Sequence, residues 1–145
     1  MARAIFSVVA GLIVAVVCVV GIESIVHVFH PAPPGFDARN QEAVRQLVAG
    51  LPLYALILVL FAWLLGAGFG AFMAVRINRR IAKWPGLLVG ALILMASLYN
   101  LFTLPHPIWY FVAAVIGVPI AAWIGTNLGY GNGPTRSPME PLPAG

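Results

Sequence analysis

Glu23, His27 and His30 are the strongest candidates for a functional site in this sequence. They are separated by four and then three residues, so on an α-helix they occupy a sector of about 60° on one face. A carboxylate and two imidazoles on one face, with His106 as a third imidazole, suit Zn²⁺ or another borderline divalent cation. The pattern therefore predicts a candidate metal site built from Glu23, His27, His30 and His106.

Three interpretations of this cluster stay open at the level of sequence. In the first, no ligand binds: Glu23 accepts a hydrogen bond from His27, and the histidines contact the adjacent loop or lipid headgroups. The second is the metal site, and the third is a site for a proton or a quinone headgroup that uses Glu23 with a histidine. The order Glu-x-x-x-His-x-x-His differs from the His-Glu-x-x-His motif of zinc proteases, so protease chemistry is not predicted.

No other catalytic constellation is apparent in the sequence. Ser24 and Ser97 are single hydroxyls without a neighbouring base, and the glycine-rich stretch 66–70 lies inside an apolar run rather than in a phosphate-binding loop. Cys18 is the single cysteine, which excludes an internal disulfide and a multi-cysteine metal site. We therefore expect a protein that is not an enzyme and has no cofactor, with Zn²⁺ or another divalent metal as the alternative.

The composition indicates that lipid, not water, surrounds most of the chain. Of its 145 residues, 61 % are hydrophobic and 8 % are charged, whereas a soluble domain carries roughly 25 % charged residues. This excludes an ordinary soluble enzyme, a disordered regulator and a nucleic-acid binder. The formal net charge of +4 comes from eight Lys and Arg against four Asp and Glu. We expect the lipid bilayer as the main partner and no nucleic acid.

Four apolar stretches are long enough to cross a membrane, which takes about 20 residues per helix. Backbone polar groups in lipid must be satisfied within the segment, so each stretch predicts a helix, and continuous apolarity argues against a β-barrel. The predicted fold is all-α: a polytopic membrane protein with four transmembrane helices in a bundle. The expected spans cover residues of about 4–29, 51–75, 85–104 and 107–128.

The segments between the spans contain clear breaking signals. Three prolines in the stretch 30–35 end the first span, because proline cannot continue a helix. Asp37 is then the expected N-cap of a short helix over 38–49, which would lie at the membrane interface in the first outer loop. Residues 104–107 form a tight turn, and the proline-rich stretch 129–145 is expected to be a disordered cytoplasmic tail.

The basic residues predict the orientation. Only Arg39 and Arg45 fall on one side of the predicted membrane, and the positive-inside rule places the richer side in the cytoplasm. Both termini are then cytoplasmic, the Glu/His cluster faces outward, and the expected location is a bacterial inner (plasma) membrane. The richer side carries Arg3, Arg76, Arg79, Arg80, Lys83 and Arg136.

Each predicted span carries small residues on one face, every four positions in the second and fourth spans and within a narrow sector in the first, a pattern that permits close helix packing in lipid. Whether these stripes meet inside one chain or between chains is open, but four stripes exceed what one bundle needs. This favours a homo-oligomer or contact with other membrane protein subunits. The stripes are Ser7, Gly11, Ala15 and Cys18; Ala62, Gly66, Gly70 and Ala74; Gly86 and Gly90; and Ala113, Gly117, Ala121, Gly125 and Gly129.

The stretches 23–35 and 100–109 resemble small bacterial four-span inner-membrane proteins of uncharacterised function. The resemblance extends over the chain to about Leu128; it implies the four-span fold and no activity. The expected function is that of an accessory or scaffold subunit, or of a self-associating membrane protein. The alternative is an outward-facing metal- or proton-binding site on Glu23, His27, His30 and His106.

Overall fold

The computed structural model describes residues 2–37, 39–78 and 82–131, and within these ranges it is all-α, as predicted. Four of its helices are long and apolar enough to cross a membrane, which suggests a multi-pass membrane protein. The tail beyond residue 131 and the predicted basic residues Arg79, Arg80 and Arg136 lie outside the described residues. The helices are α1 (Ala2–Phe29), α2 (Gln41–Ala49), α3 (Leu53–Ile77), α4 (Trp84–Thr103) and α5 (Ile108–Gly131).

Prolines mark most of the helix ends. α1 ends two residues before Pro31, and α4 ends two residues before Pro105, because a proline disfavours helical backbone in the residue before it. Pro52 precedes α3, and Pro85 lies in the first turn of α4, where the missing N–H costs no hydrogen bond. α5 runs on to Gly131, so residues 129–131 belong to this helix and not to the predicted tail.

The short helix α2 begins later than the sequence indicated. Its N-cap is Asn40, whose side-chain oxygen accepts hydrogen bonds from the backbone N–H groups of Glu42 and Ala43. Asp37 is therefore not the N-cap: its carboxylate accepts a hydrogen bond from the backbone N–H of Arg39 at 2.9 Å. Both residue types cap helices well, and Asp37 forms a local turn that ends before the helix starts.

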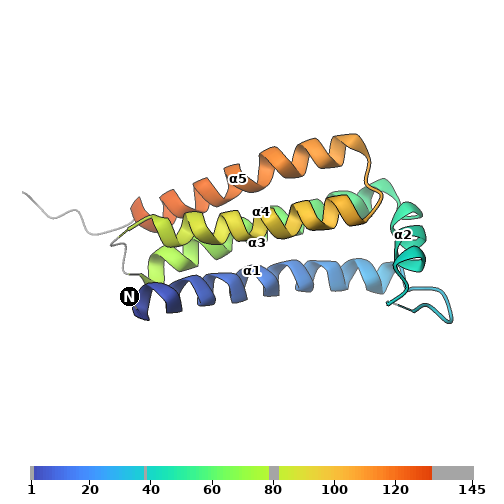
Figure 1. Cartoon of the computed structure of the whole chain (residues 1–145), viewed down its shortest axis with the longest axis horizontal. Helices are drawn as coiled ribbons and strands as arrows, with labels where there is room; N and C mark the ends of the chain where they lie inside the picture. Colours follow the sequence, from blue (N-terminus) through green and yellow to red (C-terminus); the bar gives the residue numbers. More distant parts are fainter. Residues whose placement is uncertain (1, 38, 79–81, 132–145) are drawn as a thin grey trace, which may run out of the picture.

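The four long helices lie side by side, and α2 lies across one end of the bundle (Figure 1). α3 and α4 contact each other and lie between α1 and α5, each of which packs against both of them. The start of α1 and the end of α5 are at the end opposite α2 (Figure 1). The end that carries α2, the connection 30–40 and the turn 104–107 is called the α2 end below.

The small-residue stripes of α1 and α3 meet within one chain. A Cβ atom on Gly11 would lie 2.6 Å from the carbonyl oxygen of Gly70, and one on Gly66 would lie 3.0 Å from that of Ala15. Real Cβ atoms essentially never approach backbone oxygen below 3.0 Å, so glycine is what permits this packing. Val19, rather than the predicted Cys18, continues the buried face of α1.

The stripes of α4 and α5 are used within the chain as well. A Cβ atom on Gly129 would lie 2.8 Å from the carbonyl oxygen of Phe72, and one on Gly86 would lie 2.7 Å from Val75. The number of stripes was predicted to favour an oligomer. That argument does not hold, because this bundle uses all four stripes in its own interior. Association with other chains stays a prediction.

The outer faces of the long helices carry the large apolar side chains. Small or medium side chains such as Ala15, Ala67, Val89 and Val118 are fully buried. Phe6, Met95 and Ile108, in contrast, are each more than 60 % exposed. This is the reverse of a water-soluble helical bundle, in which large apolar side chains fill the interior.

Candidate functional site at the α2 end

Glu23 is the one acidic side chain within the four long helices. It lies half-buried in the last two turns of α1, at the α2 end. Its carboxylate lies beside the side chain of Trp63 from α3 and interacts electrostatically with His27 and with Tyr110 of α5. Three helices thus contribute to the surroundings of this acid, and the indole N–H and the phenol O–H are both hydrogen-bond donors.

Tyr110 connects this acid to His106. The Tyr110 side chain is only 3 % exposed, and its ring stacks on the imidazole of His106 with a centroid distance of 4.7 Å and an interplanar angle of 24°. The Trp109 ring meets it edge-on at 5.6 Å. The start of α5 thus places one aromatic group against the predicted site residue His106 and within electrostatic reach of Glu23.

Burial favours the uncharged form of His106. Its Nδ1–H donates a hydrogen bond to the carbonyl oxygen of Leu104 at 3.1 Å. Burial lowers the pKa of this imidazole below its usual value, and the bond to Leu104 opposes that shift only in part. The neutral ring keeps Nε2 free as an acceptor, so it can accept a proton or bind a metal from that side.

His30 and His27 belong to different surroundings. The Nε2 atom of His30 is hydrogen-bonded to the Tyr54 hydroxyl, and the two rings are 5.4 Å apart, so this pair ties the end of α1 to the start of α3. His27 is exposed on the outer face of α1. The structure thus brings Glu23 and His106 toward Tyr110, but it directs His30 to another partner.

The predicted ligand set does not form a compact metal centre in the part of the chain that the structure describes. There, no group of three or more His, Cys, Asp or Glu side chains is placed to hold a metal ion. The site on Glu23, His27, His30 and His106 stays a prediction that would need movement of His27 and His30. The arrangement that is present offers one carboxylate beside the Trp63 side chain and near Tyr110.

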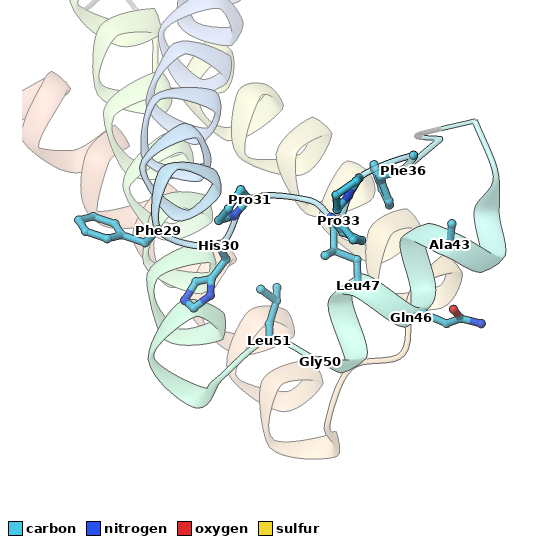
Figure 2. A pocket seen from close by; sticks show the side chains of 12 residues that line it. Phe29, His30, Pro31, Pro33, Phe36, Ala43, Gln46, Leu47, Gly50 and Leu51 are labelled. Carbon is cyan, nitrogen blue, oxygen red and sulfur yellow. The ribbon is translucent and has the colours of Figure 1, made fainter.

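A pocket of about 560 Å³ lies at the same end, between His30, the proline-rich connection and α2. Figure 2 shows Phe29, His30 and Pro31 on one side of it and Leu47 of α2 on the other. The α2 helix is fixed at this position by Arg45, whose Nε–H donates a hydrogen bond to the carbonyl oxygen of Thr103 at 3.0 Å. A cation at the C-terminus of α4 also complements the helix dipole.

Several residues of this end were not predicted from sequence as parts of a site. Trp63 and Tyr54 lie in a continuous apolar span, where nothing in the local pattern separates them from lipid-facing residues. Arg45 was expected to be a solvated position of the short helix, whereas it bonds to the end of α4. Tyr110 carries a usable signal: it follows the His106–Pro107 turn directly, within stacking reach of that histidine.

Searches against known protein families, curated proteins and solved structures find no match to this chain. The resemblance to small bacterial four-span proteins therefore stays a prediction, and the site has to be interpreted from its own chemistry.

Proposed function

We propose that this protein is a multi-pass protein of the bacterial inner membrane that serves as a non-enzymatic accessory or scaffold subunit. The observation that carries this proposal is how the bundle fills its own interior. α1, α3, α4 and α5 pack through glycine and alanine with backbone approaches such as that of Gly11 to Gly70. Such packing gives a rigid unit in lipid, and the polar features of the described chain gather at its ends.

The α2 end is the surface by which such a subunit would bind its partner. No residue of α2 is buried, and Val44, Leu47 and Val48 form a half-exposed apolar face. This face lies next to the pocket that also contains Phe36. A partner of matching chemistry is another membrane protein with an apolar segment at the membrane surface, because a helix at that depth meets both apolar and polar surroundings.

Site-specific photo-crosslinking in native membranes tests this role. A photoreactive residue at Gln46 on α2 should give an adduct with a different protein, and Leu47→Glu should abolish it. The matched control is Met95 on α4, which is 66 % exposed on the outer face of the bundle and should give no such adduct. The same adduct from both positions would contradict the proposal. An adduct of twice the chain mass would also contradict it, because it would show that the protein associates with itself and not with a different protein.

The orientation has a separate test. In a Cys18→Ser background, an impermeant maleimide added to intact cells should label Asp37→Cys at the α2 end and leave Arg3→Cys at the opposite end unlabelled. Lys and Arg are retained on the cytoplasmic side, so we expect both termini inside. Labelling of Arg3→Cys alone would show that the protein has the opposite orientation in the membrane.

A cation or proton site at Glu23 is the second candidate function. The half-buried carboxylate beside Trp63 and Tyr110 favours it, since an ionisable group in a membrane-spanning helix often marks a functional site. Metal analysis of the purified protein and of a His27→Ala variant tests the metal version: equal and negligible metal in both would end it. If Glu23 binds a proton, the fluorescence of Trp63 should change with pH in the wild-type protein. This change should be absent in Glu23→Gln.

A further inference from the structure

An apolar groove of about 390 Å³ runs between α3 and α5 on the outer surface of the bundle. It extends from Leu64 to Phe72 on α3 and is closed on the other side by Ile124 and Leu128 of α5. Its base is Gly68, where the two backbones come so close that no side chain fills the space between them. The groove is therefore a consequence of the glycine packing of these two helices.

The groove has the length of one leaflet of a bilayer. Leu64 lies close to the middle of α3 (Leu53–Ile77), and from there to Phe72 the helix rises about 12 Å. Half of the hydrocarbon thickness of a membrane is about 15 Å. When α3 spans a bilayer, the groove thus runs from the midplane toward the surface at the end opposite α2.

A cation stands at the surface end of the groove. Arg76 lies one helical turn beyond Phe72, is exposed, and holds its guanidinium over the Phe72 ring at 5.4 Å from the centroid. A long basic side chain at this depth reaches the headgroup region while its stem stays in apolar surroundings. The planar guanidinium matches the geometry of a phosphate, to which it can donate two hydrogen bonds.

Lys83 is another cation at this end of the bundle, but its side chain contacts α5 outside the groove. Its Nζ donates a hydrogen bond to the Asn127 side chain at 2.7 Å and lies 5.0 Å from the centroid of the Tyr130 ring. Asn127 is about 100° around α5 from Leu128, on the side away from the groove. Arg76 and Lys83 therefore share a membrane surface but not a site, which makes Lys83 a matched control.

We propose that the groove binds one acyl chain of an anionic phospholipid whose phosphate is bound by Arg76. Basic positions between membrane helices on the cytoplasmic side are a general feature of anionic lipid sites. This inference is independent of the accessory role, and it rests on the bundle spanning a bilayer.

Native mass spectrometry of the full-length protein with added lipid tests the proposal. We expect dioleoyl phosphatidylglycerol to bind about fivefold more tightly than dioleoyl phosphatidylcholine, which corresponds to one basic side chain acting on an anionic lipid. Arg76→Gln should remove this preference, Arg76→Lys should retain it, and Lys83→Gln should leave it unchanged. Ile124→Trp should fill the groove and weaken the binding of both lipids.

Four outcomes would overturn the proposal. Equal affinity of the wild-type protein for the two lipids would show that the phosphate site has no charge preference. Equal losses in Arg76→Gln and Lys83→Gln would show a diffuse basic surface instead of a site. Full competition by inorganic phosphate, or unchanged lipid binding in Ile124→Trp, would show that the chain does not occupy the groove. The substituted side chains lie on the surface, and circular dichroism of each variant checks that it folds.

Discussion

Gly125 of α5 faces the backbone of Gly68 on α3 so closely that a Cβ atom at position 125 would overlap the Gly68 carbonyl oxygen. This contact sets the distance between the two helices, and it also opens the groove on the outer surface beside them. One pair of glycines thus connects the stability of the bundle to its proposed lipid site.

Gly125→Ala should destabilise the protein by about 1–3 kcal/mol, the usual effect of overpacking. The obstacle is a backbone oxygen, not the end of a flexible side chain, so the two helices must move apart to accommodate the methyl group. Unfolding in a detergent titration measures the change. The control is Gly21→Ala, where a Cβ atom meets nothing within 4 Å; equal effects of the two substitutions would contradict the prediction.

Thr126→Val should be neutral or slightly stabilising. The Thr126 side chain is 1 % exposed, and its hydroxyl has no hydrogen-bond partner among the described residues, so an apolar side chain of the same shape removes an unsatisfied polar group. Thr126→Ser keeps the hydroxyl and deletes a methyl group, which should cost about 1 kcal/mol. Thermal unfolding of both variants should show that Thr126→Val is the more stable of the two. A larger loss of stability in Thr126→Val than in Thr126→Ser would refute the prediction.

Stability should fall as the pH drops below about 6.5, the ordinary pKa of histidine. Burial lowers the pKa of His106 in the folded protein, so between the two pKa values the unfolded chain binds more protons, and acidification favours unfolding. Denaturation measured at pH 7.5 and at pH 5 should show the loss, and His106→Gln should reduce it. An equal loss in the wild-type protein and in His106→Gln would contradict the prediction.

Asn40→Ala should weaken α2 by about 1 kcal/mol, the usual cost of losing an N-cap. The Asn40 side chain accepts hydrogen bonds from Glu42 at 3.0 Å and from Ala43 at 3.4 Å. Hydrogen exchange of residues 41–49 should become faster in this variant and stay unchanged in Asp37→Ala. Faster exchange in Asp37→Ala alone would show that Asp37, and not Asn40, is the N-cap of α2.

The types of the secondary-structure elements and most of their ends could be predicted from local sequence patterns. Length and apolarity within each span leave helix as the structure that satisfies its own backbone in lipid, and prolines such as Pro31 and Pro105 stop α1 and α4 through local steric effects. The local pattern predicts Asp37 as the N-cap of α2, but the structure uses Asn40. That choice depends on the path of the connection, which the local pattern does not specify.

Which helix faces meet depends on the three-dimensional packing and could not be predicted from the sequence. The position of Glu23 between Trp63 and Tyr110 depends on how α1, α3 and α5 are rotated about their axes and displaced along them. Helices that are apolar all round carry no periodic signal for that rotation. Likewise, small residues at intervals of four permit close approach of helices in lipid but do not specify which helix packs against which. The close approach of Gly11 to Gly70 shows that the stripes of α1 and α3 pack within one chain.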